Sequence, residues 1–149
     1  MTPERLRTPF ASEVTFVRPV TFLDANGLGR LHGGVVMHQV DTAAGTAGAR
    51  HVGGTVVTAS IDELSFLAPV DVGDLLIVQA RVNAAFGTSI EVGVRVEAEK
   101  WDGTNRRHTT SAYLVMVAID KDGNPCKVPE LICETDDEKR RAHQAAIRR

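Results

Sequence analysis

The chain has 149 residues, of which 43% are hydrophobic and 24% are charged, and its formal net charge is −2. This balance is typical of one globular domain and argues against global disorder, and the small charge favours neither nucleic acid nor an anionic membrane as a partner. No apolar run is long enough to span a bilayer, and residues 1–10 lack the apolar core of a signal peptide. A cytoplasmic location is therefore the expectation.

The first half of the chain predicts a strand, a loop and a helix. Residues 12–20 alternate as in a strand, and Pro19 ends the pairing or confines it to a sheet edge. Residues 24–34 contain four glycines and predict a loop with unusual backbone angles. A helix is predicted over 33–50, because apolar residues recur there at three- and four-residue spacing, at Val36, Val40, Ala43 and Ala47.

Small residues dominate this predicted helix. Gly45 and Gly48 each lower its intrinsic stability by about 1 kcal/mol relative to alanine, so the helix needs support from its surroundings. We expect that support to come from burial against a sheet, with the small residues allowing a close backbone approach. Gly53 and Gly54 then end the helix.

After the helix the hydrophobic period changes to two, which predicts four consecutive strands at 55–70, 75–86, 88–101 and 106–120. The third strand alternates most clearly and predicts one buried face and one solvated face. The residues expected on the buried face are Ile90, Val92, Val94, Val96 and Ala98. Those expected on the solvated face are Glu91, Arg95, Glu97 and Glu99. The fourth strand is apolar on both faces over its second half, which predicts a central position. The tail predicts a polar helix with Thr135 as its N-cap.

This order of elements predicts an α+β fold, with a long curved antiparallel sheet wrapped around one central helix. Its strands are longer than usual, and the edges and the other face of the sheet favour association with further copies. The expected division is an N-terminal extension at 1–11, one domain at 12–135 and a polar helical tail at 136–149.

Several common catalytic motifs are missing from the sequence. It contains no GxSxG, Walker A or HExxH pattern. The five histidines do not pair at metal-ligand spacing, and Cys126 and Cys133 match no zinc pattern and predict free thiols. We therefore expect neither a metal nor a resident cofactor.

The start of the predicted helix and two single residues are candidates for chemistry. Backbone N–H groups at Gly33 and Gly34 carry the positive end of the helix dipole and could bind an oxyanion or a carbonyl, and the alternative is a flexible loop. Asp41 has mostly small or apolar helical neighbours, which suits a general base, and the alternative is an aspartate that faces water. Asn26 could orient a water molecule, or it could be a turn residue in a left-handed conformation beside Gly27.

Two further segments could contact phosphate groups. Arg106, Arg107 and His108 form a compact basic cluster at a strand start, for which the alternative is a solvated strand end. Residues 87–89, Gly-Thr-Ser, predict either a hairpin turn or a contact with phosphate or pantetheine.

Several motifs in the same order resemble one known family. The segment NGLGRLHGGVVMHQVDTAAG (26–45) resembles the acyl-CoA thioester hydrolases of the hotdog fold, specifically the brain-type and bacterial short-chain group. The resemblance continues through residues 56–74, 87–99, 106–120 and 128–135, and it covers about 14–135. One departure lies in the loop, where the family often has Thr-Asn-His and this chain has Ala25-Asn26-Gly27.

The resemblance implies a single hotdog domain that pairs into dimers, with the active site at the dimer interface, and often a trimer of dimers. It implies Asp41 as the catalytic aspartate, Asn26 of the opposite subunit as its partner, and the amide of Gly33 or Gly34 as the group that binds the carbonyl. The implied CoA-facing residues are Gly87, Thr88, Ser89, Arg107, His108 and Thr109, and those bordering the pantetheine channel are Thr58, Ala59 and Ser60. Coenzyme A enters only as part of the substrate and the product.

The reaction expected from the resemblance is hydrolysis of an acyl-CoA thioester, with Asp41 as general base or as nucleophile. Three alternatives stay open: a hydratase or dehydratase that uses His38 beside Asp41, a non-catalytic acyl-CoA-binding regulator, and a hydrolase of acyl-carrier-protein thioesters. The sequence leaves open the acyl chain length and the choice between hexamer and tetramer.

Overall fold

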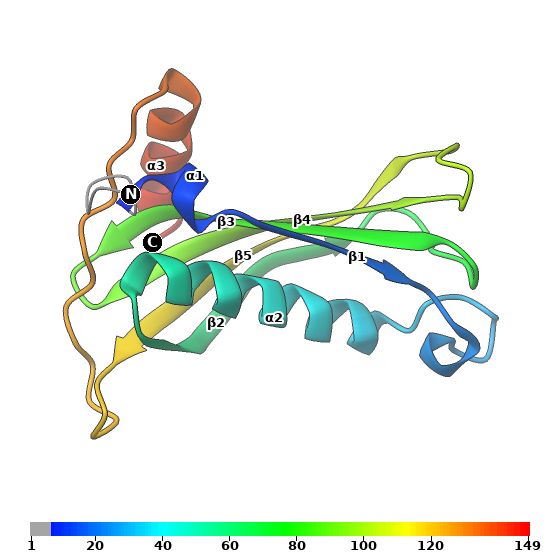
Figure 1. Ribbon diagram of the computed structural model, residues 1–149, viewed down its shortest axis with the longest axis horizontal. Helices are drawn as coiled ribbons and strands as arrows, with labels where there is room; N and C mark the ends of the chain where they lie inside the picture. Colours follow the sequence, from blue (N-terminus) through cyan, green and yellow to red (C-terminus); the bar gives the residue numbers. More distant parts are fainter. Residues whose placement is uncertain (1–6) are drawn as a thin grey trace.

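The computed structural model of the chain describes residues 7–149 and has the α+β architecture predicted from the sequence (Figure 1). Five strands form one antiparallel sheet: β1 (Val14–Pro19), β2 (Thr55–Phe66), β3 (Leu75–Phe86), β4 (Ser89–Glu99) and β5 (Arg107–Ile119). The long helix α2 (Gly33–Val52) runs along one face of the sheet, and α3 (Asp136–Arg148) stands on the opposite side near one end. Two short elements lie outside the predicted set: α1 (Pro9–Ser12) and a 3-10 turn, η2 (Phe22–Asp24).

The strand order is β1-β3-β4-β5-β2, so β1 and β2 form the two edges of the sheet. The central position predicted for β5 is confirmed, because β5 lies between β4 and β2. Pro19 ends the edge strand β1, as predicted, at a position where a residue without an N–H is tolerated. The strand β2 ends at Phe66, before the predicted end at residue 70, since Pro69 has no N–H with which to extend the ladder.

The helix α2 begins and ends at residues suited to those positions. His32 is the N-cap, and Gly53 takes a left-handed conformation with φ of 71° at the C-terminal end, where a residue without Cβ is favoured. The predicted apolar face is confirmed, since its four members are buried: Val36, Val40, Ala43 and Ala47. Gly48 approaches the sheet so closely that an added Cβ would lie 3.0 Å from Cδ1 of Ile90. A small residue is therefore required at that point of the helix.

The prediction that the outer face of β4 is solvated holds at Arg95, which is exposed, but is wrong at Glu91. Glu91 is only 4% exposed, because Arg148 of α3 covers it. The Arg148 guanidinium donates to both carboxylate oxygens of Glu91, at 2.6 and 3.1 Å, and stacks on the ring of Tyr113. Asn83 of β3 donates to the same carboxylate at 3.1 Å. The polar tail thus docks on the sheet through a buried ion pair, which its composition does not reveal.

The predicted tail helix is confirmed, with Thr135 as an N-cap that accepts from the Glu138 N–H at 3.1 Å. Cys126 and Cys133 are free thiols, as predicted. In the described part of the chain, residues 7–149, no helix is long and apolar enough to cross a membrane. Residues 1–6 lie outside the described residues. They belong to the expected N-terminal extension and to the segment 1–10 that lacks the apolar core of a signal peptide.

Candidate active site

Asp41 and Thr58 form a polar contact at the middle of α2. Both residues are exposed, and the Thr58 hydroxyl donates to Oδ1 of Asp41 at 2.5 Å. Thr58 reaches the helix from the edge strand β2, just before a bulge at Ala59 that interrupts the pairing with β5. Within residues 7–149, no group donates to Oδ2 of Asp41. The carboxylate is therefore oriented through one oxygen, and its second oxygen is available to a water molecule.

The N-terminus of α2 has an unpaired backbone N–H. The His32 imidazole accepts from the Gly34 N–H at 3.0 Å through Nδ1, and the His32 carbonyl accepts from the N–H groups of Val35 and Val36. No group within residues 7–149 accepts from the Gly33 N–H. Of the two amides considered from the sequence, Gly33 is thus the one that can bind a carbonyl or an oxyanion.

Asn26 is fixed in its loop by its side-chain oxygen. Oδ1 accepts from the Leu28 N–H at 2.8 Å and from the Arg30 N–H at 3.3 Å. Because both partners are donors, the bonding pattern sets the orientation of the amide, and Nδ2 is left as a donor. Asn26 is also a turn residue, since its carbonyl accepts from the Gly29 N–H at 3.1 Å, but the left-handed conformation considered for it is wrong, since within residues 7–149 only Glu63 and Asn105 have positive φ among non-glycine residues. The loop therefore presents an N–H2 group.

A cleft of 370 Å³ brings Asn26 and Gly33 together. Its other lining residues are mostly apolar and include Leu28, Leu31, Val36, Phe66, Leu67 and Val70. The Phe66 ring lies against the helix start, where a Cβ on Gly33 would be 3.4 Å from Cζ of Phe66. An apolar cleft with these two N–H donors suits the acyl end of a thioester.

Asp41 does not line this cleft. It lies eight residues beyond Gly33 on α2, or about 12 Å along the helix axis. One chain therefore carries two half-sites, Asn26 with Gly33 and Asp41 with Thr58. Across residues 7–149, no three His, Cys, Asp or Glu side chains are grouped so that they could hold a metal ion.

The residues expected to face CoA lie at opposite ends of the sheet. Gly87 and Thr88 form the β3–β4 turn, in which Gly87 has a φ of 59° that favours glycine, and Ser89 begins β4, whereas residues 107–109 begin β5. In the β4–β5 register Ser89 pairs with Val117 and Ala98 pairs with Arg107, so nine steps, or about 30 Å, separate the two groups. One chain does not bring them together.

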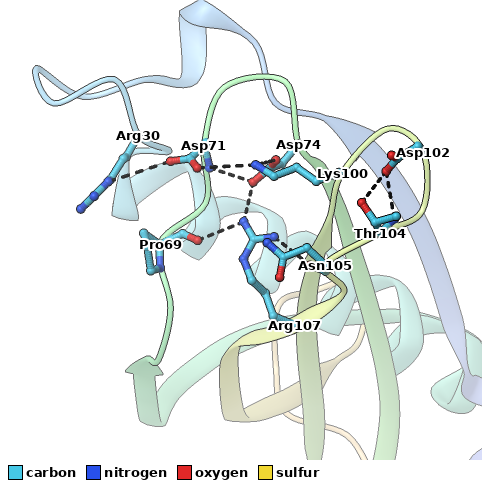
Figure 2. Close-up of polar contacts among 9 residues, drawn as sticks. All are labelled: Arg30, Pro69, Asp71, Asp74, Lys100, Asp102, Thr104, Asn105 and Arg107. Atoms are coloured by element: carbon cyan, nitrogen blue, oxygen red, sulfur yellow. Dashed lines mark hydrogen bonds and ion pairs between the residues drawn. The ribbon is translucent and has the colours of Figure 1, made fainter.

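Two of these residues have partners within the protein, which corrects the assignment of the Thr109 side chain to CoA and leaves the contact expected of Arg107 a prediction. Thr109 is 1% exposed and donates to the Val96 carbonyl at 3.1 Å, so its side chain cannot reach a ligand. The Arg107 guanidinium donates to Asp74 at 2.5 Å and to the Pro69 carbonyl at 3.3 Å (Figure 2). Arg107 thus binds groups of the protein itself.

The rest of the basic cluster is paired as well. Arg106 lies 2.7 Å from Glu97 and 3.8 Å from Glu99, and its hydrogen bond holds the pKa of Glu97 below the usual range. His108 contacts the Ser111 hydroxyl at 2.7 Å through Nε2. Each member of the cluster therefore has a partner within the protein, and Arg106 is in addition exposed, as expected of a solvated strand end.

A long antiparallel sheet around one helix, with an N–H donor at the helix start and an aspartate two turns later, is the architecture of a hotdog protein. The Thioesterase superfamily model matches residues 28–102, which is half of the chain. The chain belongs to the Thioesterase superfamily.

Relatives and solved structures agree with this family. The chain is 36% identical over 115 residues to the cytosolic acyl coenzyme A thioester hydrolase of Rattus norvegicus. The matched region covers 76% of this chain but only 30% of the length of that relative. An apo-hexameric acyl-CoA thioesterase superposes with a TM-score of 0.91 at 36% identity, over 95% of this chain and 90% of that one. The acyl-CoA hydrolase of Staphylococcus aureus, solved with butyryl coenzyme A and coenzyme A, superposes with a TM-score of 0.87 at 33% identity, over 95% and 86% of the two chains.

Proposed function

We propose that this chain hydrolyses acyl-CoA thioesters to a free acid and coenzyme A, at a site shared by two subunits. The observation that carries the proposal is the pair of complementary half-sites, with a carboxylate acceptor in one and N–H donors in the other. Hydrolysis needs both functions, because a base must take a proton from water while donors stabilise the oxyanion. The relative in rat and the complexes of the Staphylococcus aureus enzyme support acyl-CoA as the substrate class.

In the proposed reaction, Asp41 takes a proton from a water molecule as the water oxygen attacks the thioester carbonyl carbon. The Gly33 N–H and the Nδ2 of Asn26 donate to the carbonyl oxygen as it gains negative charge. The C–S bond then breaks, and the proton held by Asp41 passes to the leaving thiolate. Thiolate is a good leaving group, so the reaction needs no serine or cysteine nucleophile. Attack by Asp41 itself, through an anhydride, is the alternative for the first step.

The contact between Thr58 and Asp41 suits a general base. It occupies Oδ1 and leaves Oδ2 to accept from water, so the carboxylate is oriented without being blocked. The structures of the Staphylococcus aureus enzyme include variants in which an aspartate, a threonine or an asparagine is replaced by alanine. The same three residue types make up the proposed site here.

The proposed site requires at least a homodimer. The β2 edge is largely exposed along its length, which leaves its backbone groups open to another strand. Because the similar thioesterases include hexamers, one of them from Yersinia pestis, we propose a trimer of dimers. The remaining CoA contacts, at Ala59, Ser60, His108 and residues 87–89, would then come from more than one subunit. A cytoplasmic location stays our expectation.

A thiol-release assay over acyl-CoAs of increasing length tests this function and also measures the chain-length preference. We expect Asp41→Asn to lower turnover by at least ~100-fold, on the scale of losing one oxyanion donor. The asparagine Oδ1 can still accept from Thr58, so assembly should be unchanged. Near-normal turnover by the pure variant would exclude Asp41 as the base.

The same assay separates the alternatives. Hydration of an enoyl-CoA without hydrolysis would indicate a hydratase, although within residues 7–149 no hydrogen bond joins His38 to Asp41. Binding without thiol release would indicate a regulator. Activity on acyl-carrier-protein thioesters alone would indicate the third alternative. In single-turnover hydrolysis with isotopically labelled water, label in Asp41 would indicate the anhydride route.

A further inference from the structure

Asp74 is the centre of a polar cluster next to the candidate cleft (Figure 2). Its side chain is 1% exposed, and its two oxygens accept from Lys100 at 2.9 Å, from Arg107 at 2.5 Å and from the Asp71 N–H at 3.0 Å. Burial alone would raise the pKa of Asp74, but these hydrogen bonds lower it below the usual range. The carboxylate is therefore charged and fully engaged, at the point where β3, β4, β5 and the β2–β3 connection meet.

The cluster holds the wall of the cleft. Arg107 donates to the Pro69 carbonyl at 3.3 Å while it is bound to Asp74, and Asp74 accepts from the Asp71 N–H. Pro69 and Val70 both line the cleft. The short segment 69–71 is thus fixed from behind at both of its ends.

The same segment holds the Asn26 loop. The Leu31 N–H donates to the Val70 carbonyl at 2.8 Å, and Arg30 forms an isolated bridge with Asp71. Arg30 in turn accepts from the Asn26 N–H at 2.7 Å through its carbonyl and donates to Oδ1 of Asn26 at 3.3 Å. A short chain of contacts therefore runs from Asp74, through the segment 69–71, to the Asn26 amide.

We propose that Asp74, Arg107 and Lys100 are positioning residues, which hold Asn26 and the cleft wall in register with the thioester. This role rests on the proposed function, since alignment matters only if Asn26 acts on a substrate. A displacement of about 1 Å at a reacting centre can lower a rate on the order of 100-fold. The cluster gives Arg107 a role other than the phosphate contact expected from the sequence.

The test variant is Arg107→Met, which removes the donors to Asp74 and Pro69 but keeps an apolar side chain of similar length. Asp74 keeps Lys100 as a partner in this variant. Arg107→Lys is a milder second variant, because one ammonium can face Asp74 and Pro69, as Nη2 of Arg107 does, but it lacks the second arm of the planar fork, whose Nη1 donates to the Asn105 carbonyl at 3.0 Å.

Arg148→Met is the matched control at the other end of the sheet. The side chains of Arg148 and Arg107 are 18% and 20% exposed, and each binds a buried carboxylate. Glu91 keeps Asn83 as a donor when Arg148 is lost, just as Asp74 keeps Lys100. The control therefore reproduces the loss of a buried ion pair without touching the cleft.

Three measurements are compared for the full-length variants: the melting temperature, amide hydrogen exchange over residues 24–34, and kcat and KM for a short acyl-CoA. We expect both methionine variants to melt at lower temperature. Only Arg107→Met should exchange faster over 24–34 and lose about tenfold or more in kcat, with little change in KM. Arg107→Lys should also raise the exchange rate over 24–34 and lower kcat, but by smaller amounts than Arg107→Met.

Unchanged exchange over 24–34, or the same kcat in Arg107→Met and Arg148→Met, would overturn the proposal. A raised KM with an unchanged kcat would also overturn it and would indicate that Arg107 binds a CoA phosphate instead. A wild-type chain that releases no thiol would refute the proposed function. That failure is distinguishable, because the exchange comparison does not depend on turnover.

Discussion

Two variants that are inactive alone should restore activity when they combine in one oligomer. Asp41→Asn removes the base from one half-site, and Asn26→Ala removes the amide donor from the other. The half-sites lie about 12 Å apart along α2, so a shared site takes Asn26 from one subunit and Asp41 from another. In a dimer with one chain of each kind, one of the two sites contains both wild-type residues, and the other contains neither.

The size of the effect follows from counting sites. With equal amounts and random pairing, half of the dimers contain both kinds of chain, and each of these has one intact site, so the mixture should reach about a quarter of wild-type activity. The two chains are unfolded, mixed and refolded together, and thiol release is compared with wild type refolded in the same way. A mixture no more active than the average of the separately refolded variants would refute a site shared between subunits.

Three further predictions concern α2 and its neighbours. Thr58→Val removes the hydroxyl that donates to Asp41, and Thr58→Ser keeps it. Because a hydrogen bond to a charged group contributes about 1.5–3 kcal/mol, kcat should fall about tenfold or more in the valine variant only. Equal kcat values in the two variants would contradict this prediction. Burial lowers the pKa of His51 below its ordinary 6.5, so the unfolded chain binds the proton more readily and the free energy of unfolding should fall as the pH drops below about 6.5. Denaturant titrations between about pH 5 and 8 should show that the free energy of unfolding falls less with decreasing pH in His51→Gln than in wild type. Parallel plots of that free energy against pH for the two proteins would exclude His51 as the cause. Gly45→Ala should stabilise the protein by about 1 kcal/mol, because the new methyl meets only Cε of Met116 at 3.8 Å. Gly48→Ala should instead destabilise the protein, since packing of the new methyl against Ile90 at 3.0 Å costs about 1–3 kcal/mol. Denaturant titrations of both variants at one protomer concentration should show these opposite changes in the free energy of unfolding.

The regular elements were predictable from the sequence because their signals are local. The period of about four over residues 33–50 and the period of two in the later strands depend only on which neighbours share a face. End signals were also local, as Gly53 and Thr135 illustrate at a helix end and a helix start. Hence the fold class and the apolar face of α2 followed without knowledge of any long-range contact.

Pairing between distant charges was not predictable, because no local pattern encodes it. Arg107 and Asp74 are 33 positions apart, and Arg148 and Glu91 are 57 positions apart. The sequence shows a basic cluster and a solvated strand face, and only the fold reveals that a buried carboxylate meets each arginine. A charge run is therefore weak evidence for a ligand until the carboxylates that face it are known.

The role of Thr58 was missed for a different reason. From the resemblance, Thr58 was expected to border the pantetheine channel, but it also donates to Asp41. Strand alternation is broken at Ala59, where the β2–β5 register shifts, so the period of two cannot say which side chains of β2 turn toward α2. The proposed pairing of Asn26 with Asp41 lies beyond one chain, since Asp41 does not line the cleft that contains Asn26.

The glycines of α2 show how one composition can have several physical causes. Gly33 leaves room for the Phe66 ring at the cleft, and Gly48 leaves room for Ile90 of the sheet. Gly45 has neither constraint, and it lies with Thr42 on an open surface of the helix. The start of α2 is thus shaped by the candidate substrate cleft and its later part by the sheet. Between them, the side of α2 that faces away from the sheet is exposed at Met37, His38, Asp41 and Thr42, and the proposed second subunit would meet the helix there.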